Sequence, residues 1–431
     1  MRTFMGQSLS RRRRGHRQIA SFLVGAALLI AGCSIVATPS TQTASALKPI
    51  DQVALQSLVD TTIKELLIPG AVVLLRTPQG DFTAASGTTQ LGTTSRPRTD
   101  THFRIASNTK TMTAAVILQL AQEGKGELSL SDPVSKYVPG VPNGDNITIA
   151  QLLEMRSGLY NYTNDPIISA TIDTDPAKVW TPAELLVIAF ANPPNFPPGT
   201  KYEYNNTNYA LLGLIIEKMD GRPLATAMQK RLFEPLGMQH TVLPASTVNT
   251  IPEPYSHGYL YGSSSVALYG TPPYSPEEKA AARAGNLLPN DYTGVNHSFA
   301  AAAGGVISTG NDLATWIRAL VAGRVLNAEY QRRWLDSLKP EDPSKPAQKY
   351  GYGISQVSWG PNTIYFHGGE TPGYNSKISY DSTNQMTLIV WTNLAVSLDE
   401  QQTANTLWVK VLDHIYVVSP LSPPPSPTAT P

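Results

Sequence analysis

The sequence predicts an α/β fold of the α+β type, in which one antiparallel sheet is built from both ends of the chain. Strand patterns occur between residues 71 and 87 and return only from residue 306 onward. The intervening stretch has mainly helical patterns, with residues that cap helix starts. We therefore expect an antiparallel sheet flanked by terminal helices, with a mainly helical domain inserted between its two groups of strands.

The elements follow in a simple order. Residues 53–67 have amphipathic helical spacing, and residues 71–87 contain two apolar strands that meet at the turn Thr77-Pro78-Gln79-Gly80. Capping residues followed three positions later by Gln or Glu then mark helix starts at Thr148, Thr181 and Ser275. Further strand patterns and a last helix are expected over residues 306–308, 363–366, 374–380, 386–393 and, for the helix, 399–416.

The composition is that of an ordinary globular protein. The 431 residues are 41% apolar and 15% charged, so the chain can bury a large core as one large or two interleaved domains. The 33 basic and 32 acidic residues nearly cancel, and several basic ones cluster in residues 11–17. The remaining body is slightly acidic, which gives no indication of a nucleic-acid partner.

The stretch before residue 34 has the pattern of an export signal. A basic cluster precedes SFLVGAALLIAGC, whose apolar run is too short to span a membrane. A single cysteine is usually a small buried hydrophobe. Here, however, Ile30-Ala31-Gly32-Cys33 resembles the lipobox of bacterial lipoproteins, so we expect Cys33 to be lipidated and the protein to lie on the outer face of the cell membrane. Export by the general secretory or the twin-arginine route is left open.

These boundaries give a domain prediction. Residues 1–33 are the lipoprotein signal peptide, and 34–47 form a flexible linker rich in Ser, Thr, Ala and Pro. One domain is expected over 48–416, with an α/β part from 48–106 and 301–416 and a helical part from 107–300. Residues 417–431 are expected to be a proline-rich tail, either disordered or in a polyproline conformation.

Residues 103–125 contain the first candidate for chemistry. Ser107 and Lys110 open a helix that is apolar almost all round, and their spacing of three places them on one face. A serine hydroxyl is a poor nucleophile until a neighbouring base takes its proton, and a lysine can serve as that base. Ser-x-x-Lys alone is weak evidence, because both residues are common at exposed helix starts.

Two further segments could complete such a site. Tyr204 and Asn206 precede a helix and alternate, so that a phenol and an amide can reach one cleft. The run Phe366 to Tyr374, FHGGETPGY, begins with His367 and has glycines that allow backbone to approach a ligand closely. Taken separately, a tyrosine-rich loop and a structural histidine are the simpler interpretations.

Together, the three segments resemble the serine β-lactamase and penicillin-binding-protein superfamily. Its signature of Ser-x-x-Lys, Tyr-x-Asn and His-x-Gly occurs in order as Ser107-Asn108-Thr109-Lys110, Tyr204-Asn205-Asn206 and His367-Gly368-Gly369. The flanking residues are similar to the branch of class C β-lactamases, D-alanyl-D-alanine carboxypeptidases, D-aminopeptidases and related esterases. The resemblance covers roughly residues 53–416 and implies a β-lactamase/transpeptidase-like fold.

The resemblance implies a two-step acyl transfer. Ser107 would attack a carbonyl while Lys110 and Tyr204 share its proton, and water or an amine would resolve the acyl-enzyme. Asn206 would hold the substrate amide, and His367 and Gly369 would complete the catalytic set. The backbone N–H groups of Ser107 and Glu370 would form the oxyanion hole. The resemblance implies no cofactor and no metal.

One element of the family pattern is missing. Carboxypeptidase-type members are expected to hold a terminal carboxylate with a basic residue near the third motif, yet no Arg occurs from Trp334 to His367. Thr371 and Lys377 are the remaining candidates for substrate binding. We therefore expect esters, or amides with an uncharged leaving side, to react faster than peptides with a free carboxyl terminus.

Two classes of function follow from these observations. The first is an extracytoplasmic serine hydrolase, monomeric and acting on small molecules or peptidoglycan peptides; peptidase, β-lactamase and esterase activities all remain open. The second is a lipid-anchored protein that keeps the fold to bind peptidoglycan or a β-lactam. The three intact motifs favour the enzyme.

Overall fold

The computed structural model describes residues 47–124, 127–270 and 274–417. The predicted signal peptide with Cys33 lies outside these residues, as do nearly all of the linker and of the proline-rich tail. No helix among the described residues is long and apolar enough to cross a membrane.

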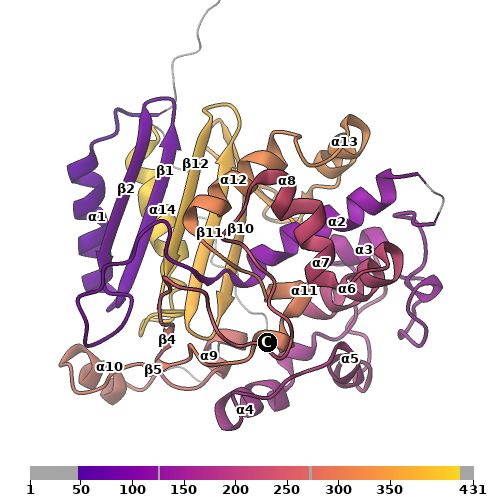
Figure 1. The fold of residues 1–431 in the computed structure, drawn as a ribbon, viewed down its shortest axis with the longest axis horizontal. Helices are drawn as coiled ribbons and strands as arrows, with labels where there is room; N and C mark the ends of the chain where they lie inside the picture. Colours follow the sequence, from indigo (N-terminus) through magenta and orange to yellow (C-terminus); the bar gives the residue numbers. More distant parts are fainter. Residues whose placement is uncertain (1–46, 125–126, 271–273, 418–431) are drawn as a thin grey trace, which may run out of the picture. The chain divides into compact units, whose positions relative to one another are not determined.

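An eight-stranded antiparallel sheet is the central element (Figure 1). Its order is β2-β1-β12-β11-β10-β9-β8-β7, so the hairpin from the start of the chain pairs with the last strand. The predicted antiparallel sheet with strands from both ends is therefore confirmed. The strands are β1 (Gly70–Thr77), β2 (Gly80–Gly87), β7 (Lys339–Pro340), β8 (Gln348–Tyr350), β9 (Ser355–Trp359), β10 (Asn362–Thr371), β11 (Tyr374–Asp381) and β12 (Met386–Thr392).

Both faces of this sheet are covered, which explains the continuous apolar runs of its central strands. In β1, Val72 and Leu74 belong to one core cluster, whereas Val73 and Leu75 belong to the other. Successive side chains of a strand point to opposite faces, so a strand buried on both sides needs apolar residues at every position.

One face packs against the terminal helices α1 (Gln52–Glu65) and α14 (Thr403–Ile415). Asp51 caps α1 by accepting hydrogen bonds from the amides of its first turn. Trp408 of α14 is fully buried, and its indole N–H donates to the hydroxyl of Ser379 on β11 over 2.9 Å. The last helix begins at Thr403, four residues after the predicted start, since residues 399–402 form a turn and a short bridge.

The opposite face packs against α12 (Gly310–Val321) and the helical region around α2 (Thr109–Gln122) and α6 (Asn206–Asp220). Eleven of the fourteen residues of α2 are buried, as its apolar composition predicts. The remaining helices are α3 (Ile149–Leu153), α4 (Pro166–Thr174), α5 (Pro182–Phe190), α7 (Leu224–Met228), α8 (Glu234–Leu236), α9 (Ser265–Tyr269), α10 (Pro276–Arg283), α11 (Ala301–Gly304) and α13 (Ala328–Asp336).

The predictions for individual helix and strand ends are confirmed at some positions and wrong at others. Capping boxes are present at Thr148, Thr181 and Ser275, as expected. The helix expected to open at Ser107 begins two residues later, because α2 starts at Thr109 and Ser107 lies in a 3-10 turn; residues 103–104 before it form β3 (Phe103–Arg104), paired with β6 (Ile307–Ser308). Strand β10 runs on to Thr371 and thereby includes the whole third motif. A two-stranded sheet of β4 (Tyr259–Leu260) and β5 (Asn290–Asp291) completes the strands.

Candidate active site

Ser107 lies in a single 3-10 turn (Ala106–Asn108) between β3 and α2. The turn has an unusual backbone, since Ala106 adopts a φ of 48°. It is fastened to the sheet by Asn108, whose amide donates to the carbonyl of Ile105 over 3.1 Å and to Ser376 of β11 over 2.8 Å. The nucleophile candidate is thus held at the junction of the sheet and the helical region.

Lys110 is fully buried one turn further along and has three polar partners. Its Nζ lies 3.0 Å from the Ser107 hydroxyl and 2.7 Å from the Asn206 side-chain oxygen. The third partner is the backbone carbonyl of Ala303 in α11, also at 2.7 Å. The structure therefore brings together the first and second motifs, and adds a backbone contact from a segment 193 residues away.

These partners define what a neutral Lys110 can do. The carbonyl of Ala303 and the amide oxygen of Asn206 can only accept, so the two N–H groups of a neutral amine are used by them. Its lone pair is then left for the Ser107 hydroxyl. Burial lowers the pKa of Lys110 well below its ordinary value, which favours this neutral form. Lys110 is accordingly placed to accept the serine proton.

Tyr204 contributes a second hydroxyl at the same point. It hydrogen bonds to Ser107, and its ring packs 4.8 Å from Lys110 Nζ. Burial raises the pKa of Tyr204 above its ordinary value, although 36% of the residue's surface is exposed, so water moderates this rise. The phenol is therefore protonated near neutral pH and can pass a proton without carrying a lasting charge.

Asn206 is the first residue of α6, and its neighbour Asn205 caps that helix. The Asn206 side-chain nitrogen donates to Thr163 over 2.9 Å, while its backbone N–H donates to Asn161 over 3.0 Å. Since the amide oxygen accepts from Lys110, the orientation of the amide is fixed by its partners. One N–H of the amide is left for a substrate carbonyl.

His367 lies on β10 and is buried, with 3% of its surface exposed. Its Nδ1 donates to the carbonyl of Gly368 over 2.6 Å, so its Nε2 accepts from the Tyr350 hydroxyl at 3.1 Å. Burial lowers the pKa of His367 to about 3, and the imidazole is neutral. Tyr350 in turn packs edge-on against Tyr204, with ring centroids 6.4 Å apart. The histidine thus adds no charge to the site.

Gly369 is the point where β10 meets the nucleophile turn. A Cβ at this position would lie 2.1 Å from the carbonyl oxygen of Ile105 and 2.7 Å from the Asn108 amide. The neighbouring Gly368 differs, because the atom nearest to an added Cβ would be 3.9 Å away, in the side chain of Lys377. The close approach at residue 369 requires glycine, whereas residue 368 has room for a side chain.

A small hollow of about 30 Å³ opens beside Ser107. Glu370 and Thr371 line it from β10, and Asn206 and Thr163 line it from the helical region. Thr371 follows His367 and Gly369 at alternate positions of the strand, so all three share the face that points to Ser107. The remaining lining residues are Ala106, Tyr162, Leu268, Phe299, Ala300, Ala303 and Gly304.

Comparison with known proteins now assigns the family. The family model described as Beta-lactamase matches residues 55–413. The chain belongs to the β-lactamase family. The solved structure of a D-stereospecific amidohydrolase from Streptomyces sp. shares 31% identity and a TM-score of 0.71, covering 83% of this chain and 99% of that one. A D-amino acid amidase from Ochrobactrum anthropi SV3 shares 26% identity and a TM-score of 0.69, covering 84% and 97%.

Curated relatives are matched over less of their length. The "Putative penicillin-binding protein PbpX" of Bacillus subtilis (strain 168) is 28% identical over 308 residues, which are 72% of this chain and 66% of that protein. "Protein flp" of Staphylococcus aureus (strain NCTC 8325 / PS 47) is 34% identical over 196 residues, 43% of this chain and 38% of that protein. The chain therefore matches less than two thirds of the length of these relatives.

Lys377 is the one candidate that the structure of this β-lactamase family member contradicts. It lies on β11 with its side chain on the face covered by α14, opposite Ser107. There its Nζ donates to Asn405 over 2.6 Å and lies 4.2 Å from the ring centre of Phe366. Burial lowers the pKa of Lys377 to about 7. Adjacent strand residues alternate in direction, so Ser376 faces the nucleophile turn and Lys377 cannot.

Glu370 also has its side chain on the α14 face, where its carboxylate accepts a hydrogen bond from Asn375 over 3.2 Å. Partial burial raises the pKa of this carboxyl to about 8. The carboxyl group of Glu370 therefore lies on the opposite face of the sheet from Ser107. Only the backbone of this residue remains as a candidate for the oxyanion hole.

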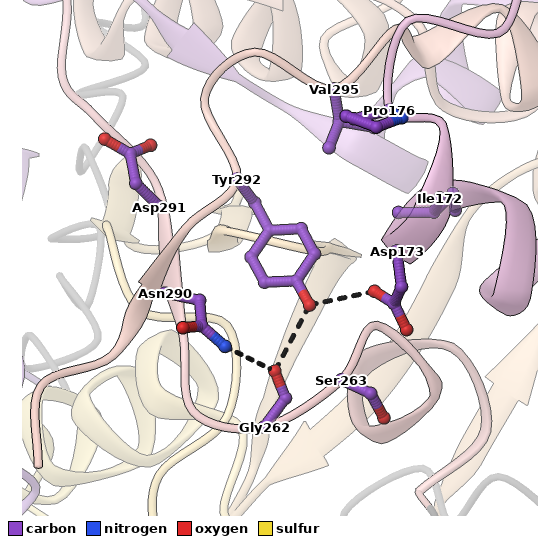
Figure 2. Close-up of a pocket in the computed structure, with 9 residues that line it drawn as sticks. All are labelled: Ile172, Asp173, Pro176, Gly262, Ser263, Asn290, Asp291, Tyr292 and Val295. Atoms are coloured by element: carbon purple, nitrogen blue, oxygen red, sulfur yellow. Dashed lines mark hydrogen bonds between the residues drawn. The ribbon is translucent and has the colours of Figure 1, made fainter.

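A second, larger hollow of about 400 Å³ is lined by residues from α4 and the loop after it, from the loop after β4, and from the segment around β5 (Figure 2). In it the Tyr292 hydroxyl donates to Asp173 over 2.9 Å and contacts the carbonyl of Gly262, which also accepts from Asn290. Among the described residues, no cluster of three or more His, Cys, Asp or Glu side chains could hold a metal ion. The residues that line this hollow include none of the site residues predicted from the sequence.

Proposed function

We propose that this chain is a serine hydrolase that forms an acyl-enzyme at Ser107. The observation that carries the proposal is the surroundings of Lys110, whose two acceptor partners leave its lone pair for the serine hydroxyl. If Lys110 had only a structural role, burial that favours loss of its charge would give the fold no advantage. A nucleophile beside such a base is the arrangement required for acyl transfer.

The reaction follows from the positions of the donors and acceptors. Ser107 Oγ forms a bond to the substrate carbonyl carbon as its proton passes to Lys110. The bond to the leaving group then breaks, and the proton reaches that group through the Tyr204 hydroxyl. Water attacks the resulting ester by the reverse route and frees Ser107. The backbone N–H groups of Ser107 and Glu370 are the proposed oxyanion donors, each worth on the order of 3 kcal/mol in similar sites.

Amides and esters with an uncharged leaving side are the proposed substrates. Among the described residues that line the hollow beside Ser107 there is no Lys or Arg to pair with a terminal carboxylate. The named activities of the two solved neighbours, a D-stereospecific amidohydrolase and a D-amino acid amidase, support amide substrates with a D-configured acyl part. Carboxypeptidase and β-lactamase activities are the alternatives within the same chemistry.

The substrate proposal is tested with purified protein and a matched panel. D-alanyl-D-alanine carrying a free carboxylate, a carboxamide or a methyl ester should differ in kcat/KM, with both uncharged forms ahead. A cephalosporin and a short acyl ester complete the panel. Faster turnover of the free acid would contradict the proposal and favour a carboxypeptidase.

A binding protein without turnover is the second candidate, but no observation favours it over the enzyme. Anchoring to the outer face of the membrane through Cys33 also remains a proposal, supported by the lipobox-like sequence. Replacing Cys33 with Ser should move the protein from the membrane fraction to the soluble fraction. Retention of the Ser variant in the membrane would contradict lipidation at this residue.

A further inference from the structure

Thr371 is a polar residue beside the nucleophile with a fixed partner on its far side. It is 4% exposed and lines the hollow that contains Ser107. Its hydroxyl lies 2.9 Å from Nε2 of His297, a buried histidine from the segment that precedes α11. This contact links the substrate hollow to a residue that no motif of the sequence includes.

The tautomer of His297 follows from its other nitrogen. Nδ1 lies 2.9 Å from the backbone carbonyl of Val295, and a carbonyl can only accept, so Nδ1 carries the proton. Burial and the nearby guanidinium of Arg104 lower the pKa of His297 well below its ordinary value, which keeps the ring neutral. Nε2 is then a bare acceptor, and the hydroxyl proton of Thr371 must point at it.

A hydroxyl has one proton and two lone pairs. With its proton used by His297, Thr371 can offer only lone pairs to the hollow. A substrate carboxylate or ester oxygen placed there would meet another acceptor, whereas an N–H group would find a partner. The buried hydrogen bond to His297 thus makes the Thr371 hydroxyl an acceptor, and not a donor, toward the hollow.

We propose that Thr371, held by His297, selects substrates that place an N–H donor beside the scissile bond. In this role Thr371 contacts substrate, and His297 acts as a positioning residue. The inference rests on the proposed serine hydrolase activity and adds a distinction within its uncharged substrates, namely those with an N–H donor beside the scissile bond over those without one. Substrate selection then depends on the direction of the hydrogen bond that Thr371 makes, in addition to the absence of a positively charged partner for a terminal carboxylate.

The test compares ratios of kcat/KM within two matched series. The leaving-side series is the D-alanyl-D-alanine carboxamide against its methyl ester, and the acyl-side series is N-acetyl-D-alanyl against propionyl p-nitroanilide. In the parent enzyme at least one series should favour the N–H member. Thr371→Val should reduce that preference by about fivefold or more, whereas Thr371→Ser should retain it.

Variants of His297 separate positioning from general damage. His297→Phe frees the Thr371 hydroxyl to rotate and donate, so the N–H preference should fall while the member without the N–H group loses little activity. His257→Phe is the matched control, because His257 contacts Asp291 away from the Ser107 hollow. It should leave both ratios unchanged.

The experiment gives different results if the selection by Thr371 fails and if the hydrolase proposal fails. Equal ratios in the parent, Thr371→Val and His297→Phe enzymes, with Ser107 still acylated by a fluorophosphonate, would overturn the selection by Thr371 alone. Absence of any acylation at Ser107 would instead overturn the hydrolase proposal. A uniform loss across all substrates in His297→Phe, with no change of ratio, would assign His297 a purely structural role and also contradict the inference.

Discussion

Replacing Gly369 with Ala should disable acylation while leaving most of the fold intact. The added Cβ would lie 2.1 Å from the Ile105 carbonyl oxygen, whereas ordinary contact begins at 3.4 Å. Both neighbours are backbone or tightly held: Asn108 is fixed by Ser376, and Ile105 leads directly into the nucleophile turn. The methyl group therefore cannot be accommodated by rotating a flexible side chain.

The size of the effect follows from the required movement. Strand β10 and the Ser107 turn must separate by about 1 Å, and a misplacement of this size can reduce an enzyme rate on the order of 100-fold. The proposed oxyanion donors lie on the two segments that separate, Glu370 on β10 and Ser107 in the turn. Overpacking of a buried contact also costs about 1–3 kcal/mol, so a modest fall in Tm is expected as well.

Gly368→Ala provides the matched control. It adds the same methyl group one position earlier, where the nearest atom would be 3.9 Å away. The acylation rate of each variant is measured from the burst of p-nitrophenol released by an activated ester, and Tm is measured by calorimetry. Equal acylation rates for the Gly369→Ala and Gly368→Ala enzymes would refute the assignment of a close contact between β10 and the nucleophile turn.

Four other substitutions test the proton path and the position of Lys377. Lys110→Ala and Tyr204→Phe should each slow acylation strongly, and the double variant should be little slower than either, because groups that act as a unit are not additive; losses that multiply would argue against a shared path. Asn206→Asp puts a carboxylate beside Lys110, raises its pKa and should shift the rising limb of the acylation pH profile to higher pH; an unshifted limb would contradict Lys110 as the base. Lys377→Met should leave the ratio of carboxamide to free-acid turnover unchanged. Burial lowers the pKa of Lys377 to about 7 in the folded protein, against an ordinary value of 10.5 in the unfolded chain. Between these pH values the unfolded chain binds one more proton than the folded protein, so the free energy of unfolding of the parent should increase with pH more than that of the Met variant. Urea titrations measure this difference, and equal increases for the two proteins would contradict the burial of Lys377.

Much of the sheet could be predicted because its central strands are buried on both faces. An apolar run such as that of β1, closed by a Pro- and Gly-containing turn, has few other interpretations. The strands β7 and β8 could not be found, since they are two and three residues long and largely polar; β7 is the edge strand of the sheet, and β8 lies next to it. Their pairing is set by neighbouring strands rather than by their own pattern.

The site divides in the same way. Ser107, Lys110 and the residues of the second and third motifs are recognisable because the chemistry fixes their types and short spacings. Tyr350 and His297 carry no local pattern, and their contacts with His367 and Thr371 depend on how distant segments pack. The role of His297 can be inferred only once its partners, a backbone carbonyl and the Thr371 hydroxyl, are known.

Lys377 shows a further limit of sequence reasoning. The strand that contains it was expected, and alternation along that strand already separates Ser376 from Lys377. Which of the two faces Ser107 is decided by the register of β11 against β10, where Gly369 pairs with Ser376 and Gly368 with Lys377. That register depends on long-range packing, which a single sequence does not reveal.

The central claim is that Ser107 is the nucleophile and Lys110 its base. Intact-protein and peptide mass spectrometry after exposure to a fluorophosphonate measures this directly, with Ser107→Ala and Lys110→Ala treated in parallel. One adduct per chain is predicted on Ser107 of the parent, with none on Ser107→Ala and much slower labelling of Lys110→Ala. An adduct of equal yield on Ser107→Ala, or none on the folded parent, would contradict the account.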